Sequence, residues 1–408
     1  MEQQVLFRAV VDLCLLIALA EVASSINARF GIPRILGTML TGILFGPHLI
    51  GGISIGGRPL IEFNELVYVF SEVGAVLLLF TAGLHMKFSD LLQSGIAVLS
   101  VALLGVVIPY FLGLAAAILL GYSWYIGMII GGSLAATSIA ISVKCLDELD
   151  KMDTSEAKCI IGAAVIDDVL ALSIASVIFA ATVGQSEVST LGMIQMLGTT
   201  LLLWFVLTFV SVKFIPRGLN WVYKFNDREG HLLEIVAILI CFGYATLSGR
   251  LGLSPLVGAF IAGMAIADFG GLKDISTFIE KIEILFVPLF FVVMGGSLDP
   301  RALMTGDFVL ILVLSLVAIV SKLVGCGLPA AYFLKDREKG IRVGYGMMSR
   351  GEIGLVIASI GITYSIISKE VYAALIVVIF LTSLIPPFLL KRSYLKESML
   401  CEYDQLER

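Results

Sequence analysis

Two adjacent carboxylates lie within a long apolar stretch of the sequence. Asp167 and Asp168 occur in Gly162–Leu170, well inside an apolar block that covers roughly 157–183. Successive residues of a helix point about 100° apart, so one carboxylate can meet a positive partner while the other faces a cavity. Two uncompensated buried carboxylates would be costly, which disfavours a purely structural role for both. The pair is the first candidate for binding a cation or a proton.

A single lysine is the best candidate for the positive partner. Lys322 lies in the apolar segment Val320–Gly327. It is about 16 Å from the end of its predicted helix at 1.5 Å per residue, which is a long reach for a lysine that snorkels to the membrane surface. We therefore expect a salt bridge between Lys322 and a buried aspartate.

Two further charges in one predicted helix lie beside glycines. Arg350 and Glu352 occur in Met348–Gly354, which also contains two glycines and a serine. This composition indicates an unwound segment rather than a continuous helix. Two roles stay open for the charges, namely neutralisation of the dipoles at the helix ends and direct contact with an ion.

An uncharged segment of another predicted helix has a similar composition. Gly131–Ser138 contains two glycines and ends in Thr137 and Ser138, which can break a helix and free backbone carbonyls for a cation. Alone this signal is weak, because Ser and Thr often bond back to the preceding turn. Glu72, nearer one membrane surface, is a lesser candidate.

The composition identifies the elements that must position these residues. Of the 408 residues, 59% are apolar and 14% are charged, and the mean hydropathy is +1.02. Soluble domains carry about 25% charged residues, so this composition excludes a water-soluble globule. It also excludes a disordered chain. The net charge of −5 excludes a nucleic-acid binder of the usual basic kind. The cysteines and histidines form no metal-binding pattern, and no cofactor is expected.

Long apolar blocks predict an all-α polytopic membrane protein, since a bilayer-spanning helix needs about 20 apolar residues. The predicted blocks, about thirteen in all, cover roughly 5–27, 32–50, 64–84, 91–120, 122–147, 157–183, 190–215, 231–249, 253–268, 277–297, 304–333, 340–366 and 370–390. Of the 27 Lys and Arg residues, 20 fall in one alternating set of connections and five in the other. This asymmetry predicts an N-terminus outside the cell and a C-terminus in the cytoplasm.

The two interrupted segments are spaced like equivalent parts of a repeat. Gly131–Ser138 lies in the fifth predicted helix and Met348–Gly354 in the twelfth, an odd number of helices apart. Two six-helix halves joined by a linker helix would therefore run in opposite directions, as inverted-topology repeats do. Transporters of this kind place their ion site where the broken helices cross.

In the order and spacing of these features, the chain resembles the monovalent cation:proton antiporters. The branch is that of the bacterial sodium/proton antiporters, which is related to the potassium-efflux antiporters. Gly31–Pro47 and Ser71–Leu84 are similar to the second- and third-helix signatures of the family, and the resemblance covers essentially the whole chain. It implies a secondary transporter that exchanges Na⁺ for H⁺ by elevator-like alternating access, and not an enzyme.

The resemblance also implies a domain organisation. It predicts a homodimer in the bacterial inner membrane, with the fifth and twelfth helices crossing. Core helices would move against dimerisation helices within one transmembrane domain. The implied ranges are 1–395 for this domain, about 91–183 and 304–390 for the core, about 5–84 and 190–297 for dimerisation, and 396–408 for a short cytoplasmic tail.

The same resemblance assigns roles to the site residues. Asp168 would be the main carrier of the cation and the proton, and Asp167 would pair with Lys322. Thr137 and Ser138 would supply oxygen ligands to Na⁺ together with Asp168. Members like the potassium-efflux branch commonly have an amide in place of the first aspartate, whereas this chain has Asp167. Na⁺ is therefore favoured over K⁺, with Li⁺ also open, and exchange is expected to be electrogenic.

Other classes of protein fit the residues less well. An intramembrane aspartyl protease needs its two aspartates on different helices, whereas these two are adjacent. A channel needs a continuous polar lining, which the predicted helices lack. A sodium-coupled solute symporter on the same fold is the more serious alternative, but it would require a polar pocket for an organic substrate.

Overall fold

The structure is a computed structural model of the chain and describes residues 2–55, 57–89, 95–182, 190–224, 231–301 and 307–406. Apart from one short hairpin, the regular elements in these ranges are helices. They are α1 (Glu2–Arg29), α2 (Arg34–Phe45), β1 (Ser54–Ile55), β2 (Arg58–Pro59), α3 (Glu65–Leu84), α5 (Gly95–Leu119), α6 (Trp124–Ala135), α7 (Ile139–Glu148), α8 (Ser155–Thr182), α9 (Thr190–Tyr223), α10 (Leu232–Arg250), α11 (Pro255–Ile266), α12 (Leu272–Gly296), α14 (Phe308–Lys322), the π-helix η1 (Leu323–Gly327), α15 (Leu328–Leu334), α16 (Arg337–Gly346), α17 (Glu352–Thr363) and α18 (Lys369–Leu406).

Side-chain caps define several helix starts. Asn64 accepts a hydrogen bond from the Val67 backbone N–H at the start of α3, and Asp307 accepts from Val309 and Leu310 at the start of α14. Ser254 caps α11, whose first residue is a proline. These residue types satisfy the unpaired N–H groups of a helix start, so local sequence chemistry sets these boundaries.

Among the described residues, eight helices are long and apolar enough to cross a membrane. They are Phe7–Arg29, Glu65–Leu84, Gly95–Leu119, Trp124–Glu148, Leu202–Tyr223, Leu232–Arg250, Phe308–Leu334 and Lys369–Lys396, and three shorter apolar helices are Arg34–Phe45, Pro255–Ile266 and Ile353–Thr363. The predicted class, a helical multi-pass membrane protein, agrees with this architecture. The count of about thirteen spans stays a prediction.

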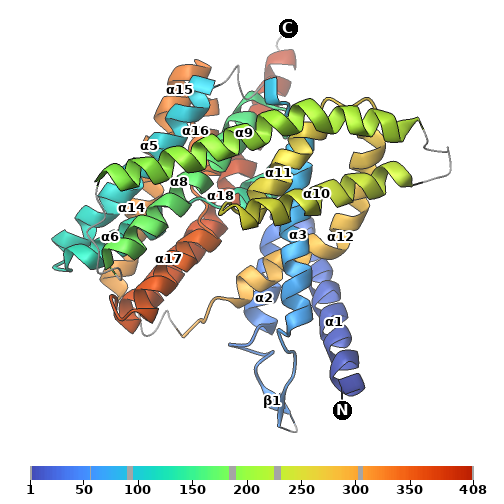
Figure 1. Cartoon of the computed structure of the whole chain (residues 1–408). Coiled ribbons are helices and arrows are strands. Elements are labelled where there is room, and N and C mark those ends of the chain that lie inside the picture. The colour runs from blue at the N-terminus through green and yellow to red at the C-terminus, as the bar shows by residue number, and fades with distance from the viewer. Residues whose placement is uncertain are drawn as a thin grey trace. The chain divides into compact units, whose positions relative to one another are not determined.

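The chain divides into two compact units, each built from separate stretches of sequence (Figure 1). Unit 1 comprises Met1–Phe30, Arg34–Gln93 and Val188–Pro300, and unit 2 comprises Gly31–Pro33, Ser94–Glu187 and Arg301–Arg408. Unit 1 thus contains α1 to α3 and α9 to α12, and unit 2 contains α5 to α8 and α14 to α18.

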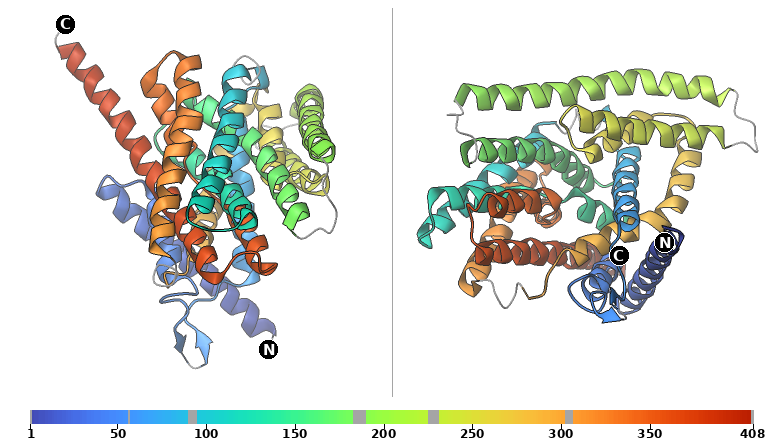
Figure 2. Two further views of the ribbon diagram at one scale, coloured as in Figure 1. Left: turned by 90° about the vertical axis from the view of Figure 1, so that its left-hand side faces the viewer. Right: turned by 60° about the horizontal axis from the view of Figure 1, so that its bottom comes forward.

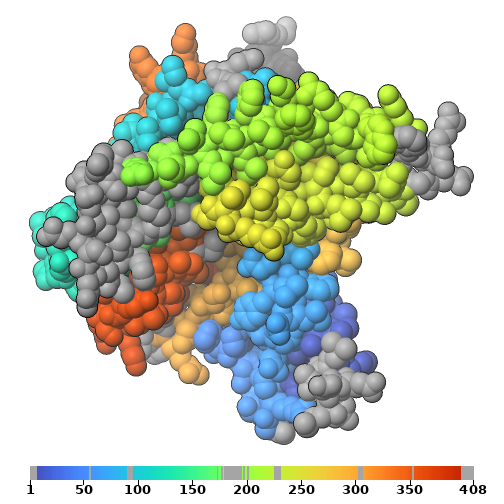
Figure 3. Space-filling view, in the orientation of Figure 1, coloured from blue at the N-terminus to red at the C-terminus, as the bar shows by residue number. Residues whose placement is uncertain are grey.

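In unit 1, helices approach each other backbone to backbone. Helix α3 packs against α11 and α12. A Cβ atom added to Gly263 of α11 would lie 2.1 Å from the Phe80 carbonyl oxygen, and one added to Gly42 of α2 would lie 1.9 Å from that of Val292. Glycine is therefore required at both contacts. Figure 3 shows α3 in blue on the outer face of this unit.

In unit 2, α5 packs against α6, α8 and α14, and α17 packs against α6 and α18. Buried aliphatic side chains, among them Ile129, Leu134, Leu314, Ile357 and Val378, form the core between these helices. Figure 2 shows the long helix α18 extending beyond the other helices of this unit at its C-terminal end. All the polar residues of the candidate site lie in unit 2.

Candidate ion-binding site

Two helices of unit 2 are interrupted, and their interruptions touch. Helix α6 ends at Ala135 and α7 begins at Ile139, while α16 ends at Gly346 and α17 begins at Glu352. The glycines and hydroxyl residues of Gly131–Ser138 and Met348–Gly354 predicted a broken helix at each of these places. The Ser138 N–H donates to the Ser349 carbonyl oxygen at 2.9 Å, and the Ser349 hydroxyl donates to the Ser138 carbonyl oxygen at 2.8 Å. The two breaks are thus joined by one backbone hydrogen bond and one side-chain hydrogen bond.

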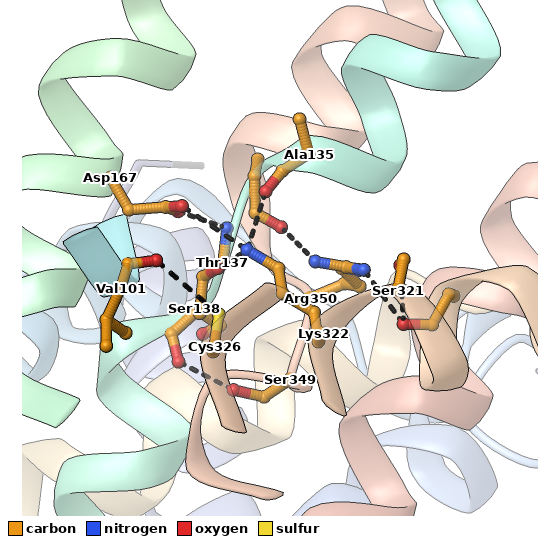
Figure 4. Close-up of polar contacts among 12 residues, drawn as sticks. Val101, Ala135, Thr137, Ser138, Asp167, Ser321, Lys322, Cys326, Ser349 and Arg350 are labelled. Carbon is orange, nitrogen blue, oxygen red and sulfur yellow. Dashed lines mark hydrogen bonds and ion pairs between the residues drawn. The ribbon is translucent and has the colours of Figure 1, made fainter. Parts of the chain in front are cut away.

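The first break positions a buried cluster of opposite charges (Figure 4). Lys322 Nζ lies 3.3 Å from Asp167 Oδ1, and both side chains are fully buried. Lys322 also donates to the Thr137 hydroxyl at 2.6 Å. The other Asp167 oxygen accepts from the Thr137 backbone N–H at 2.9 Å. The buried aspartate that pairs with Lys322 is therefore Asp167, and Lys322 does not snorkel to the surface.

Lys322 and Arg350 both bind carbonyl groups at the end of α6. Lys322 Nζ donates to the Ala135 oxygen at 3.0 Å, and Arg350 Nη1 donates to the Ala136 oxygen at 3.2 Å. The last carbonyls of a helix have no partner within the helix and carry the negative end of its dipole. The two cations therefore satisfy these carbonyls and compensate the dipole, which is one of the two roles left open for Arg350.

Arg350 also connects the break to a neighbouring helix. Its Nη2 donates to the Ala318 carbonyl oxygen of α14 at 3.2 Å, and its own carbonyl accepts from the Ser383 hydroxyl of α18 at 2.6 Å. The Arg350 side chain is fully buried. It therefore fixes three helices around the second break, while Lys322 follows four residues after Ala318 on the same helix.

Asp168 and Ser138 are placed beside this cluster by the same elements. Asp168 follows Asp167 on α8 and is 3% exposed, and Ser138 ends the first break. The Ser138 hydroxyl is buried and has no hydrogen-bond partner in the described part of the chain. A buried hydroxyl oxygen without a partner is the kind of group that a Na⁺ ion can use, because hard cations prefer oxygen ligands. The Thr137 hydroxyl is already engaged by Lys322.

Two other candidate site residues were predicted from the sequence, Glu352 and Glu72. Glu352 is the first residue of α17, and its side chain lies outside the described residues. Glu72 lies on α3 in unit 1, where it lines a groove with Glu65 and Phe242 and not the Asp167 cluster. Within the residues described, no group of three or more His, Cys, Asp or Glu side chains could hold a metal ion.

Several site residues were not predicted from the sequence. Ser349 joins the two breaks, and the Ser142 hydroxyl of α7 donates to the Gly346 carbonyl at the end of α16. The π-helix Leu323–Gly327 directly follows Lys322, and π-turns often occur at functional sites. The glycines of this segment could have indicated a close contact between helices, because a Cβ on Gly325 would lie 2.7 Å from the Leu104 carbonyl oxygen.

A helical membrane protein in which two interrupted helices meet beside buried opposite charges has the design of a secondary transporter. The family model for the transmembrane sodium/hydrogen exchanger matches residues 14–392. The chain therefore belongs to the sodium/hydrogen exchanger family.

Individual relatives match over nearly the full length of both chains. The chain is 34% identical to the Na⁺/H⁺ antiporter of Enterococcus hirae, covering 93% of this chain and 96% of that one. It is 31% identical to the Na⁺/H⁺-K⁺ antiporter GerN of Bacillus cereus, covering 94% and 95%. Its fold matches that of the sodium proton antiporter MjNhaP1 from Methanocaldococcus jannaschii with a TM-score of 0.66 and 19% identity, over 95% of this chain and 96% of that one.

Proposed function

We propose that this chain exchanges Na⁺ for H⁺ across the bacterial cell membrane by alternating access, with Asp168 as the carrier. The observation that carries the proposal is the buried Asp167–Lys322–Thr137 cluster at the break between α6 and α7. Asp168, the carboxylate next to Asp167 on α8 and itself buried, is the group that we assign to the transported ion. Ser138 supplies a hydroxyl ligand, and Thr137 becomes one when Lys322 releases it.

Exchange follows from competition at one carboxylate. Na⁺ and H⁺ each neutralise Asp168, whereas an empty carboxylate would carry its charge through a medium of low dielectric constant at high cost. The loaded carrier therefore crosses and the empty one does not. When Na⁺ binding separates Lys322 from Asp167, the buried Lys322 ammonium would lose a proton from Nζ. Two protons would then leave for each Na⁺ that binds, which makes the exchange electrogenic.

We further propose that unit 2 is the moving core and unit 1 the dimerisation domain of a homodimer. The division of the chain into these two units supports this assignment, as does the location of all the cluster residues in unit 2. The proposed topology has about thirteen spans in inverted repeats, with the N-terminus outside and the C-terminal tail in the cytoplasm. Crossing of the interrupted helices near the membrane centre would place Asp168 within reach of both sides.

The test is Na⁺-driven proton flux in proteoliposomes, with Li⁺ and K⁺ tested in parallel because the name of one relative includes K⁺. We expect Asp168→Asn to reduce Na⁺-driven flux to the level of empty liposomes. Asp153→Asn, which alters an exposed aspartate in the connection between α7 and α8, is the matched control and should retain the wild-type rate. Full exchange by Asp168→Asn would refute the carrier assignment, and flux that is insensitive to membrane potential would refute the electrogenic scheme.

A further inference from the structure

A second buried charge cluster lies in unit 2, on different residues from the proposed ion site. Glu156 and Arg342 form an ion pair with an N–O distance of 3.0 Å, and each side chain is only 3% exposed. Glu156 lies in the first turn of α8, where the helix dipole favours a negative charge. Arg342 lies in the middle of α16. The pair therefore joins the helix of Asp167 to the helix that leads into the second break.

Helix α18 completes this cluster with two side chains. The Tyr394 hydroxyl donates to Glu156 Oε1 at 3.2 Å, and the Tyr394 ring lies 4.3 Å from the guanidinium carbon of Arg342. Arg342 Nε donates to the Ser393 hydroxyl at 3.1 Å. One guanidinium group thus pairs with a carboxylate, stacks on a ring and binds a hydroxyl, which only the planar fork of arginine can do.

Stability alone does not account for such a cluster. Replacing a buried ion pair by apolar residues of similar volume is often neutral or stabilising, whereas a charge network can specify one register between helices. The register matters here because Arg350 lies eight residues after Arg342. A one-residue rotation of α16 would turn its side chains by about 100° and would move Arg350 away from the Ala136 carbonyl.

We infer that Glu156, Arg342 and Tyr394 are positioning residues that set α16 relative to α8 and thereby hold Arg350 and Asp167 at the proposed ion site. We call these three residues the clasp. Glu156 lies eleven residues before Asp167, about 16 Å along α8, so the clasp acts on the site through the helices without touching the ion. The inference rests on the proposed function, since the quantity that the clasp controls is the affinity for the transported cation.

The decisive variant is the neutral double substitution Glu156→Gln/Arg342→Gln, which leaves no unpaired buried charge. We expect it to fold, to elute as wild type in size-exclusion chromatography, and to exchange with a Na⁺ KM raised about tenfold, which corresponds to about 1.4 kcal/mol of lost cation binding. Arg342→Lys keeps the charge without the fork and should also raise the KM. Tyr394→Phe, which keeps the ring, should raise it only a few-fold.

The matched control is Lys339→Gln. Lys339 lies one turn before Arg342 on α16 and donates to the exposed Ser155 hydroxyl at 3.0 Å, so its replacement removes a link between the same two helices without touching the clasp. We expect an unchanged KM. A folded double variant with a wild-type KM would overturn the positioning role, even with a lower melting temperature. If wild-type protein itself shows no Na⁺-driven flux, the proposed function fails instead.

Discussion

The two interrupted helices end in different ways. The carbonyls at the end of α6 accept hydrogen bonds from two cations, Lys322 and Arg350. The Gly346 carbonyl at the end of α16 accepts from the neutral hydroxyl of Ser142, and the neutral hydroxyl of Ser349 donates to the Ser138 carbonyl of the other break. Both arrangements satisfy buried carbonyls, but only the first couples a helix end to charge. The end of α6 is therefore bound by charged groups, whereas that of α16 is bound by a neutral one.

This difference predicts that substitutions at the end of α6 cost more than those at the end of α16. Charged hydrogen bonds contribute about 1.5–3 kcal/mol, against about 1 kcal/mol for neutral ones. Hydrogen bonds between membrane helices average about 0.6 kcal/mol. Three substitutions test this order, from the largest expected effect to the smallest.

Lys322→Gln should have the largest effect on stability. It leaves Asp167 buried without its cation, and removing one partner of a buried ion pair costs about 3–5 kcal/mol. The measurement is the free energy of unfolding in detergent by denaturant titration. The double variant Asp167→Asn/Lys322→Gln removes both charges and should recover most of the loss. A single variant as stable as wild type would show that the pair is not formed.

Arg350→Met should have an intermediate effect. It removes the hydrogen bonds to the Ala136 and Ala318 carbonyls, but the apolar Met side chain leaves no buried charge at this position, so we expect a total loss of about 1.5–3 kcal/mol. Arg350→Lys retains one charge but cannot reach both carbonyls with a planar fork, so its unfolding free energy should fall between wild type and Arg350→Met. Equal stability of the Lys and Met variants would mean that charge at this position is unimportant.

Ser349→Ala should have the smallest effect, about 1 kcal/mol, because the lost bond to the Ser138 carbonyl has a neutral donor. Ser142 still donates to the Gly346 carbonyl in this variant. Ser173→Ala, which removes only a bond to the preceding turn of α8, is the control for loss of a buried serine. The proposed contrast between the two helix ends fails if Ser349→Ala destabilises the protein as much as Lys322→Gln.

Much of the site could be predicted because buried charge is rare in a membrane helix. Asp167, Lys322 and Arg350 stood out against apolar neighbours, and glycines beside Ser and Thr indicated the two interruptions. The partners of these charges could not be predicted in the same way. Ala135, Ala136 and Ala318 take part through their carbonyls, and every residue has a carbonyl, so the sequence carries no signal for which ones are used.

The residues of the clasp could not be predicted from the sequence either. Glu156 and Arg342 resemble ordinary charges of a polar connection, and Tyr394 lies more than fifty residues from Arg342 along the chain. Their burial became visible only when α8, α16 and α18 were brought together. A charge near a helix end is usually solvated, so composition alone gives no reason to single these residues out.

By itself, the sequence determined that this protein is a helical membrane protein with a few charges inside apolar helices. The sequence could determine these features because hydropathy depends only on residues that are close together in the chain. The tertiary structure decided which charge meets which carbonyl, that Ser138 and Ser349 join the two breaks, and that the units are assembled from separate stretches. Such contacts depend on packing between distant segments, and no local pattern encodes them.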